Sequence, residues 1–236
     1  MLLNDENGDL YCGTKENCLK IVNLNNSNET NQSSIKSIPT NFRIISFLKK
    51  ENKLLTGLDN GEIVVWDLIN EDPKQIKIIQ GHSNRVRSLI NHGNDKFISG
   101  SYDKSIKVWD LESGSCLKTI ETKDNPIYCL VLFEQDKVIS GDGNGNISIW
   151  SLEESETNSL LKTWKAHDSW IYKLLLNGES ELISGSGDRK IKVWNLKTYK
   201  CICILVGHSN IIIDLLINQE GQLISCSWDK TIKIWK

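Results

Sequence analysis

The sequence predicts an all-β chain built from six copies of a unit of four short strands. Three observations lead to this prediction. Six segments align with one another without a gap, their marker residues recur at nearly constant spacing, and apolar residues in them alternate with a period of two. Stretches of helical period with capping residues do not occur in the sequence. At 236 residues the chain is long enough to bury a sizeable core.

A tryptophan marks one position of the repeat, and the first copy replaces it with valine. The markers are Val22, Trp66, Trp109, Trp150, Trp194 and Trp235. Successive markers lie 44, 43, 41, 44 and 41 residues apart. A period of about 40–45 residues with four strands is the spacing of propeller blades. We therefore expect one domain, 1–236, with repeats at about 1–38, 39–79, 80–120, 121–164, 165–205 and 206–236.

Each repeat is expected to run through four strands in order. In the third repeat, the short apolar run 86–90 forms the first strand. The tight turn at 101–104 joins the second strand to the third, 104–110, in which Ile106 and Val108 share one face. Residues 116–120 form the fourth strand.

The repeats resemble the WD-repeat (β-transducin-like) family over essentially the whole chain. The dipeptide that names the family stands at Trp66-Asp67 and Trp109-Asp110, and the later copies depart from it. The family's opening Gly-His pair stands at 81–82 and 207–208, with Ala166-His167 as a near match. The resemblance implies a WD-repeat β-propeller of four-stranded antiparallel blades, with six recognisable repeats of which the first and last are incomplete. Closure with six blades and membership of a seven-bladed propeller both stay open.

The two ends of the chain suggest a shortened product. The first copy begins at Met1 inside its innermost strand, and the last copy stops one residue after Trp235, before its outermost strand. Family propellers commonly complete the last blade with a strand from the other terminus. The resemblance therefore implies an open edge strand, and we expect that an outer strand is missing from an N-terminally shortened chain.

Four polar and aromatic residues recur at fixed relative positions in three copies. The sets are His82, Ser99, Asp103 and Trp109; His167, Ser184, Asp188 and Trp194; and His208, Ser225, Asp229 and Trp235. A Ser–His–Asp set invites a catalytic interpretation, but its threefold repetition favours a structural one, because an enzyme needs one nucleophile. The resemblance implies that each set is hydrogen-bonded within its blade. The fourth copy has Lys123 and Asn144 at the His and Asp positions, and the second has Thr40 and Asn60, so these blades should be less firmly tied.

Three further registers carry the candidate binding residues: the third residue after the His position, the residue two further on, and the residue before the turn Asp position. In propellers of the family, they lie at the mouth of the central channel on the narrow face. The partner-binding candidates are Arg43, Arg85, Arg87, Tyr102, Tyr128, Trp170, Tyr172 and Trp228. Tryptophan, tyrosine and arginine are the residues of interaction hot spots. For Ile45, Ile211 and Ile213 at the same registers, packing against the neighbouring blade is favoured.

Arg85 and Arg87 suggest a partner chemistry. They are two residues apart in an extended segment, so they should point to the same side and can clamp a carboxylate or phosphate. The resemblance implies a non-catalytic scaffold for protein–protein interactions through the narrow face. The alternative is a substrate-recognition or targeting domain of a larger enzyme, such as a ubiquitin ligase or kinase. The expected partners are proteins or peptides, acidic or phosphorylated ones among them, and no small-molecule substrate.

Composition narrows the remaining function classes. With 28 basic and 30 acidic residues the net charge is -2, so nucleic acid is not an expected partner. The sequence shows neither a secretory signal nor a membrane-spanning helix, which predicts no membrane partner and a cytoplasmic or nuclear rather than secreted protein. The seven cysteines lack the paired spacing of a zinc site, and reduced thiols are expected. No metal, cofactor or enzymatic activity is expected.

Overall fold

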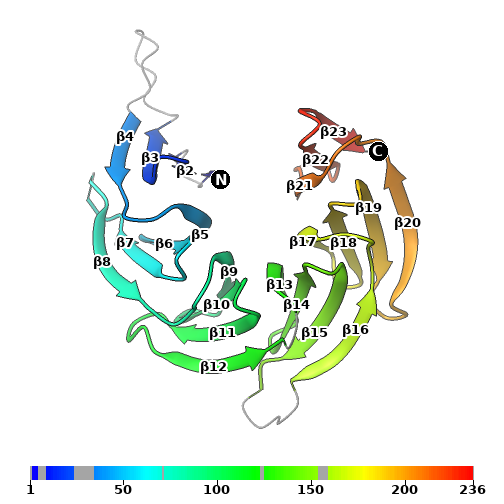
Figure 1. Cartoon of the computed structure of the whole chain (residues 1–236), viewed down its shortest axis with the longest axis horizontal. Helices are drawn as coiled ribbons and strands as arrows, with labels where there is room; N and C mark the ends of the chain where they lie inside the picture. Colours follow the sequence, from blue (N-terminus) through cyan, green and yellow to red (C-terminus); the bar gives the residue numbers. More distant parts are fainter. Residues whose placement is uncertain are drawn as a thin grey trace. The chain divides into compact units, whose positions relative to one another are not determined.

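Every element of the computed structural model is a β-strand. The structure describes residues 2–4, 9–23, 35–70, 72–122, 125–153 and 159–235. In this part of the chain, consecutive strands form five four-stranded sheets and one three-stranded sheet (Figure 1). Lys123, the polar loop at 25–34 and the centre of the loop at 151–159 lie outside the described residues. No described helix is long and apolar enough to cross a membrane.

The chain divides into two compact units, Met1–Thr119 and Ile120–Lys236. The single domain expected over 1–236 stays a prediction. The three sheets of the first unit consist of β1 (Leu2–Asn4), β2 (Asp9–Gly13), β3 (Cys18–Asn23) and β4 (Ile35–Pro39); β5 (Ile44–Lys50), β6 (Lys53–Leu58), β7 (Ile63–Asp67) and β8 (Lys74–Ile79); and β9 (Val86–His92), β10 (Lys96–Ser101), β11 (Ser105–Asp110) and β12 (Cys116–Glu121).

The second unit repeats this plan with one strand fewer. Its sheets consist of β13 (Ile127–Phe133), β14 (Lys137–Asp142), β15 (Asn146–Ser151) and β16 (Leu160–Lys165); β17 (Ile171–Asn177), β18 (Glu181–Ser186), β19 (Lys190–Asn195) and β20 (Lys200–Val206); and β21 (Ile212–Ile217), β22 (Leu223–Ser227) and β23 (Ile232–Trp235). Over the described residues the last repeat is thus one strand short, as predicted, and β1 of the first repeat has only three residues.

The central strands are apolar on both faces because each lies in a sheet that is covered on both sides. In β6, Leu54 packs in the cluster between the first and second sheets, and Leu55 packs in the cluster between the second and third. Leu182 and Ile183 of β18 divide in the same way between the two clusters of the second unit. Successive residues of a strand point to opposite faces, and full burial of one such side chain contributes about 1.5–3 kcal/mol.

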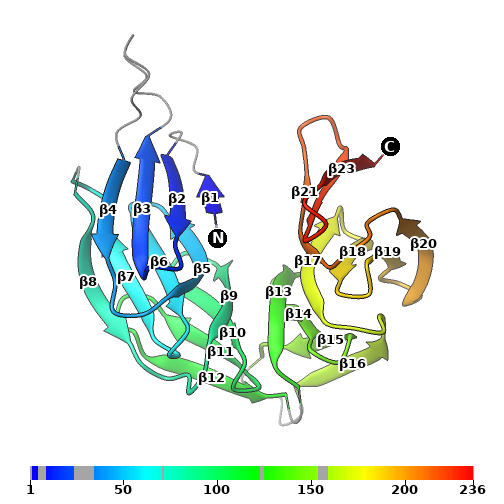
Figure 2. The ribbon, with the colours of Figure 1, turned by 45° about the horizontal axis from the view of Figure 1, so that its top comes forward.

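The turns lie at the two ends of the strands in each sheet, and these two turn-bearing sides are called edges below (Figure 2). We call the edge that carries the loop before the first strand, together with the turn between the second and third strands, the entry edge. The opposite edge carries the other two turns. Within each unit the first strands of neighbouring sheets lie side by side, β5 beside β9 and β13 beside β17 (Figure 1). The entry edges of neighbouring sheets are therefore adjacent as well.

Candidate functional site

The structure brings the three recurring polar sets together in one geometry. In the third repeat, His82 Nδ1 lies 2.8 Å from Asp103 Oδ2 and His82 Nε2 lies 2.6 Å from Ser99 Oγ. The indole N–H of Trp109 donates to the same serine oxygen at 2.7 Å. The sets of the fifth and sixth repeats have the same bonds, all between 2.7 and 2.9 Å.

The direction of each bond follows from the chemistry of the groups. An ionised carboxylate can only accept, so His82 Nδ1 donates to Asp103 and Nε2 accepts from the Ser99 hydroxyl. That hydroxyl in turn accepts from Trp109. The three serines, at 0%, 0% and 1% exposed, offer no surface to a substrate carbonyl. Burial thus adds to the repetition as an argument against a nucleophilic serine.

The aspartates of these sets ionise more readily than usual. Burial opposes the charge of Asp188, but hydrogen bonds from His167 and two backbone N–H groups outweigh it and lower its pKa to about 2. The pKa of Asp229 is lowered chiefly by the hydrogen bond from Thr231. For Asp103, burial is again outweighed, here by His82 and Ser105, and its pKa is lowered. Each carboxylate also accepts the backbone N–H of the residue after its histidine.

Sequence reasoning missed two groups of residues in these networks. Ser105 and Thr231 each donate from the hydroxyl to the turn aspartate two residues earlier, at 2.7 and 2.6 Å. Ser101 accepts the N–H of Asp103 and donates to the carbonyl of Asn84, so it joins the turn to the preceding loop. Ser186 and Ser227 form the same bonds in the fifth and sixth repeats. The signal in the sequence is a hydroxyl residue two positions before the turn aspartate.

Among their described residues, the second and fourth repeats keep only the inner end of the network, the bond between the indole and the hydroxyl. Trp66 donates to Thr56 at 3.0 Å, and Trp150 donates to Ser140 at 2.8 Å. Thr40, aligned with the histidines, instead donates to the carbonyl of Phe42. In the fourth repeat Asn144 binds Asn125, an exposed contact at 2.5 Å between the turn and the loop.

One backbone bond defines the entry edge in five repeats. The N–H of the residue before the turn aspartate position donates to the carbonyl of the residue that lies before the first strand. The pairs are Asp59 with Arg43, Tyr102 with Arg85, Gly143 with Pro126, Gly187 with Trp170, and Trp228 with Ile211, at 2.9 to 3.1 Å. Two of the three registers that the sequence singled out are therefore neighbours within each of these five repeats.

The second candidate register coincides with a β-bulge. In the fourth repeat Ile127 pairs with Asp142 and Cys129 pairs with Gly141, which leaves Tyr128 as the extra residue. The extra residues of the other four repeats are Ile45, Arg87, Tyr172 and Ile213. A bulge re-aims its side chain relative to the strand. The bulge at Arg87 interrupts the simple alternation on which the expected common side of Arg85 and Arg87 was based, so that expectation stays a prediction.

The aromatic candidates of the second unit differ in exposure. Trp170 is 45% exposed and Trp228 is 56% exposed. Tyr128 and Tyr172 are only 6% and 8% exposed, and their role as direct partner contacts stays a prediction. Their rings support Trp170, with ring centroids 5.5 Å and 6.1 Å from it, and they contact each other at 5.5 Å.

Glycines occupy the neighbouring turns, and the one at 143 makes room for Tyr128. A Cβ at Gly143 would lie 3.1 Å from Tyr128 Cε2, closer than packed side chains normally approach. Gly187 stands at the same turn position beside Tyr172. Where the turn carries an aromatic residue, as at Tyr102 and Trp228, the bulge position carries Arg87 or Ile213 instead. A large side chain at the turn position is thus accompanied by a non-aromatic one at the bulge position, and a glycine at the turn position by a tyrosine at the bulge position.

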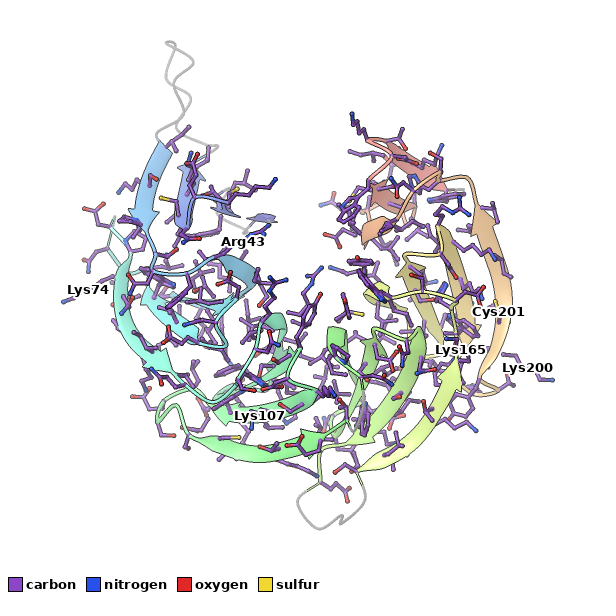
Figure 3. The ribbon with its side chains drawn as sticks, viewed as in Figure 1. Arg43, Lys74, Lys107, Lys165, Lys200 and Cys201 are labelled. Carbon is purple, nitrogen blue, oxygen red and sulfur yellow. The ribbon has the colours of Figure 1, made fainter. Side chains whose placement is uncertain are left out.

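Arginines dominate the entry edge of the first unit. Arg43, just before β5 (Figure 3), is exposed, and so is Arg85 before β9. The guanidinium carbon of Arg85 lies 6.0 Å from the centroid of the Tyr102 ring, a cation–π contact. Arg87 is half-buried at its bulge. This edge therefore presents positive charge, whereas the exposed candidates of the second unit are aromatic.

The described part of the chain holds neither a metal-binding cluster nor a disulfide. Its His, Cys, Asp and Glu residues form no group of three or more that could hold a metal ion. All seven cysteines are described, and each is a free thiol.

Comparison with protein families decides which family has this repeat. The family "WD domain, G-beta repeat" matches residues 73–110, 114–151, 158–195 and 199–236, more than half of the chain. The chain belongs to the WD-repeat family. Each match begins in or before the outer strand of one sheet and continues through the inner strands of the next, so the sequence repeat is offset from the sheet by one strand.

Relatives of this WD-repeat chain include subunits of larger assemblies. It is 40% identical to the COMPASS component SWD3 of Saccharomyces cerevisiae over 78 residues, which are 32% of this chain and 24% of the relative. It is 31% identical to the SAGA complex subunit Spt8 of Schizosaccharomyces pombe over 67 residues, 28% of this chain and 13% of the relative. The matched segments span between 6% and 24% of the curated relatives.

Solved structures confirm the fold of these WD repeats. The WD40 β-propeller domain of Doa1 superposes with a TM-score of 0.84 at 20% identity, covering 100% of this chain and 77% of that domain. The predicted all-β WD-repeat propeller class is thus confirmed.

Proposed function

We propose that this WD-repeat chain is a non-catalytic scaffold that binds other proteins through the entry edge of its sheets. This edge corresponds to the narrow face in propellers of the family. The observation that carries the proposal is Trp170, which is 45% exposed although its ring rests on two buried tyrosines. Names of relatives as a complex component and a complex subunit support an interaction role.

The support beneath Trp170 favours binding for an entropic reason. A flexible exposed side chain loses about 0.5–1.5 kcal/mol of conformational freedom when a partner immobilises it. Tyr128 stacks on the Trp170 ring with an interplanar angle of 25°, and Tyr172 contacts it at 53°. Because these contacts already order the indole, most of that loss has occurred before binding. An ordered, exposed tryptophan is the residue type most enriched in hot spots.

The arginines suggest what else the partner carries. Arg85 is exposed and its guanidinium lies over Tyr102, so its position is partly fixed. Arginine binds carboxylates and phosphates with two parallel hydrogen bonds. We therefore propose that the first unit binds a protein or peptide segment with an acidic or phosphorylated residue. Seven free thiols suit the reducing cytoplasm or nucleus, where we place this function.

Pull-down with the full chain tests the proposed edge. Trp170→Ala and Arg85→Ala are each compared with the wild type in the recovery of co-purifying proteins. Trp170→Ala is expected to reduce recovery of a specific partner at least tenfold, which corresponds to a loss of about 1.4 kcal/mol or more. Arg85→Ala should reduce it most strongly at low salt, because screening weakens exposed charge pairs.

Lys74→Ala is the matched control. Lys74 is exposed at the start of β8, the outer strand of its sheet, away from the entry-edge loops (Figure 3). Lys74→Ala should recover as much of the partner as the wild type does. Circular dichroism melts should show that all three variants fold. Equal recovery by Trp170→Ala and the wild type would show that the partner binds elsewhere.

A further inference from the structure

The crevices between neighbouring sheets differ between the two units at the edge opposite to the entry edge. In the first unit, the crevice between the sheets β5–β8 and β9–β12 is closed by Lys50 at the end of β5. Its ammonium donates to Asn91 Oδ1 at 2.9 Å and to the carbonyls of Gly93 and Lys96 at 2.5 and 3.1 Å. Lys50 is 9% exposed. One side chain thus crosses from one sheet to the turn of the next.

A second lysine covers the same crevice from the outer strand. Lys77 of β8 donates to the carbonyl of Glu112 in the turn between β11 and β12. Its aliphatic stem lies over Gly114, where a Cβ would come within 3.1 Å of Lys77 Cδ. The carboxylate of Glu112 lies 3.6 Å from Lys53 Nζ. Polar bridges therefore fill this crevice.

The equivalent crevice of the second unit has lost these bridges. The strand registers place Phe133 at the position of Lys50 and Leu176 at the position of Asn91. In place of a filled crevice there is a pocket of about 750 Å³ between the sheets β13–β16 and β17–β20. Phe133 and Leu176 line it, together with the buried side chains of Ile149 and Leu196.

Tyr199 forms a wall of this pocket from a backbone conformation that disfavours side chains. Its φ is 59°, and it occupies the position of Gly114, whose φ is 76°. Both residues donate a backbone N–H to the residue four positions earlier. The Tyr199 ring packs against Trp164, with 5.5 Å between centroids. Non-glycine residues in this conformation cost energy and concentrate at functional sites.

The rim of the pocket is positively charged. Lys197 stands where the first unit has Glu112, and it is exposed. Lys162 Nζ lies 5.2 Å from the Tyr199 ring centroid. Lys137 is already paired with Glu134 at 2.6 Å, and Glu179 is the remaining acidic residue of the rim. Lys162 and Lys197 therefore present a net positive charge beside an apolar floor.

We propose that this pocket binds a partner segment in which an apolar side chain is followed or preceded closely by Asp or Glu. The apolar side chain enters between Phe133 and Leu176, and the carboxylate lies between Lys162 and Lys197. Its volume is within the range of natural ligand sites. The pocket lies at the edge opposite to the proposed scaffold surface, so the two sites are independent.

Selection of peptides tests the proposal. A displayed library of random twelve-residue peptides is panned on the full chain, with counter-selection on the variant Phe133→Lys/Leu176→Asn. This variant copies the residues that close the first unit's crevice, so it is expected to fold and to fill the pocket. Selected peptides should share an apolar residue within three positions of Asp or Glu. As synthetic peptides they should bind the wild type at least tenfold more tightly than the double variant.

Two single variants keep the test decisive if the double variant does not fold. Lys197→Glu, an exposed change, should weaken the same peptides at least fivefold. Leu117→Asp should not weaken them, because Leu117 lies on β12, the outer strand of another sheet. Its exposure of 42% is close to the 45% of Leu161, which lines the pocket. Failure to select any peptide that distinguishes the variants would overturn the proposal. So would selected peptides without acidic residues, or wild-type self-association that Lys197→Glu abolishes, since the occupant would then be a second copy.

Discussion

The fourth and fifth repeats hold the same tryptophan in two different ways. In the fifth, a buried chain of bonds runs from Trp194 through Ser184 and His167 to Asp188, 21 residues from the histidine. In the fourth, the chain stops at Ser140, which accepts from Trp150. The common element is thus the bond between indole and hydroxyl, and the link to the turn is a separable addition.

The fourth repeat stabilises its turn by local bonds instead. Asp142, 6% exposed, accepts the backbone N–H groups of Asn144 and Asn146 and the side-chain amide of Asn146. These partners lie within four residues of the aspartate. The loop before the first strand is joined to this turn by the exposed bond between Asn144 and Asn125. A buried long-range link has been replaced by a local one and an exposed one.

The largest difference between the two arrangements should appear when the serine is removed. Ser184→Ala leaves both the Trp194 N–H and the His167 ring nitrogen buried without a partner, whereas Ser140→Ala leaves only the Trp150 N–H. Each unsatisfied group costs about 1–3 kcal/mol. We expect Ser184→Ala to lower the free energy of unfolding by about 2–4 kcal/mol and Ser140→Ala by about 1–2 kcal/mol. Denaturant unfolding of both variants measures this, and equal losses would break the comparison.

An intermediate effect is expected at Asp188, and it should depend on pH. Asp188→Asn exchanges a charged hydrogen bond for a neutral one and should cost about 1–2 kcal/mol at pH 7. The folded pKa of about 2 lies below the ordinary value of 3.8, so this stabilisation is present above about pH 4 and is lost as the pH falls through 2.

Unfolding curves at pH 7, 4 and 2.5 check this dependence. The difference between wild type and Asp188→Asn should narrow between pH 4 and 2.5. A difference that stays constant across this range would mean that the charge of Asp188 does not stabilise the fold.

The smallest effect is expected for the reciprocal change in the fourth repeat. Asn144→Asp introduces a carboxylate where no histidine stands, and the side chain is exposed. Exposed substitutions of this kind change stability by about 0.5 kcal/mol or less. Thermal melts of Asn144→Asp beside Asp188→Asn provide the measurement. A stabilisation above 1 kcal/mol would show that the fourth repeat has a cationic partner in the histidine's place.

Much of the candidate site was predictable because it repeats. The pairing of the register before the first strand with the register before the turn aspartate follows from one backbone bond that recurs in five repeats. The burial of Tyr128 and Tyr172 was not predictable, since it depends on the bulge and, for Tyr128, on the space left by Gly143. The pocket beside Tyr199 was missed as well, because Phe133 and Leu176 are ordinary apolar residues in a strand pattern.

The sequence by itself determined the repeat, the strands and the His–Ser–Asp–Trp sets. These features follow from alternation and from residues at constant separation, so a single chain displays them. Only the tertiary structure decided which exposed aromatic is supported, which arginine is re-aimed and which crevice stays open. Those outcomes depend on side-chain volumes from neighbouring strands and sheets, where Phe133 meets Leu176 and Lys50 meets Asn91. Spacing along the chain carries no measure of the volume left between such residues.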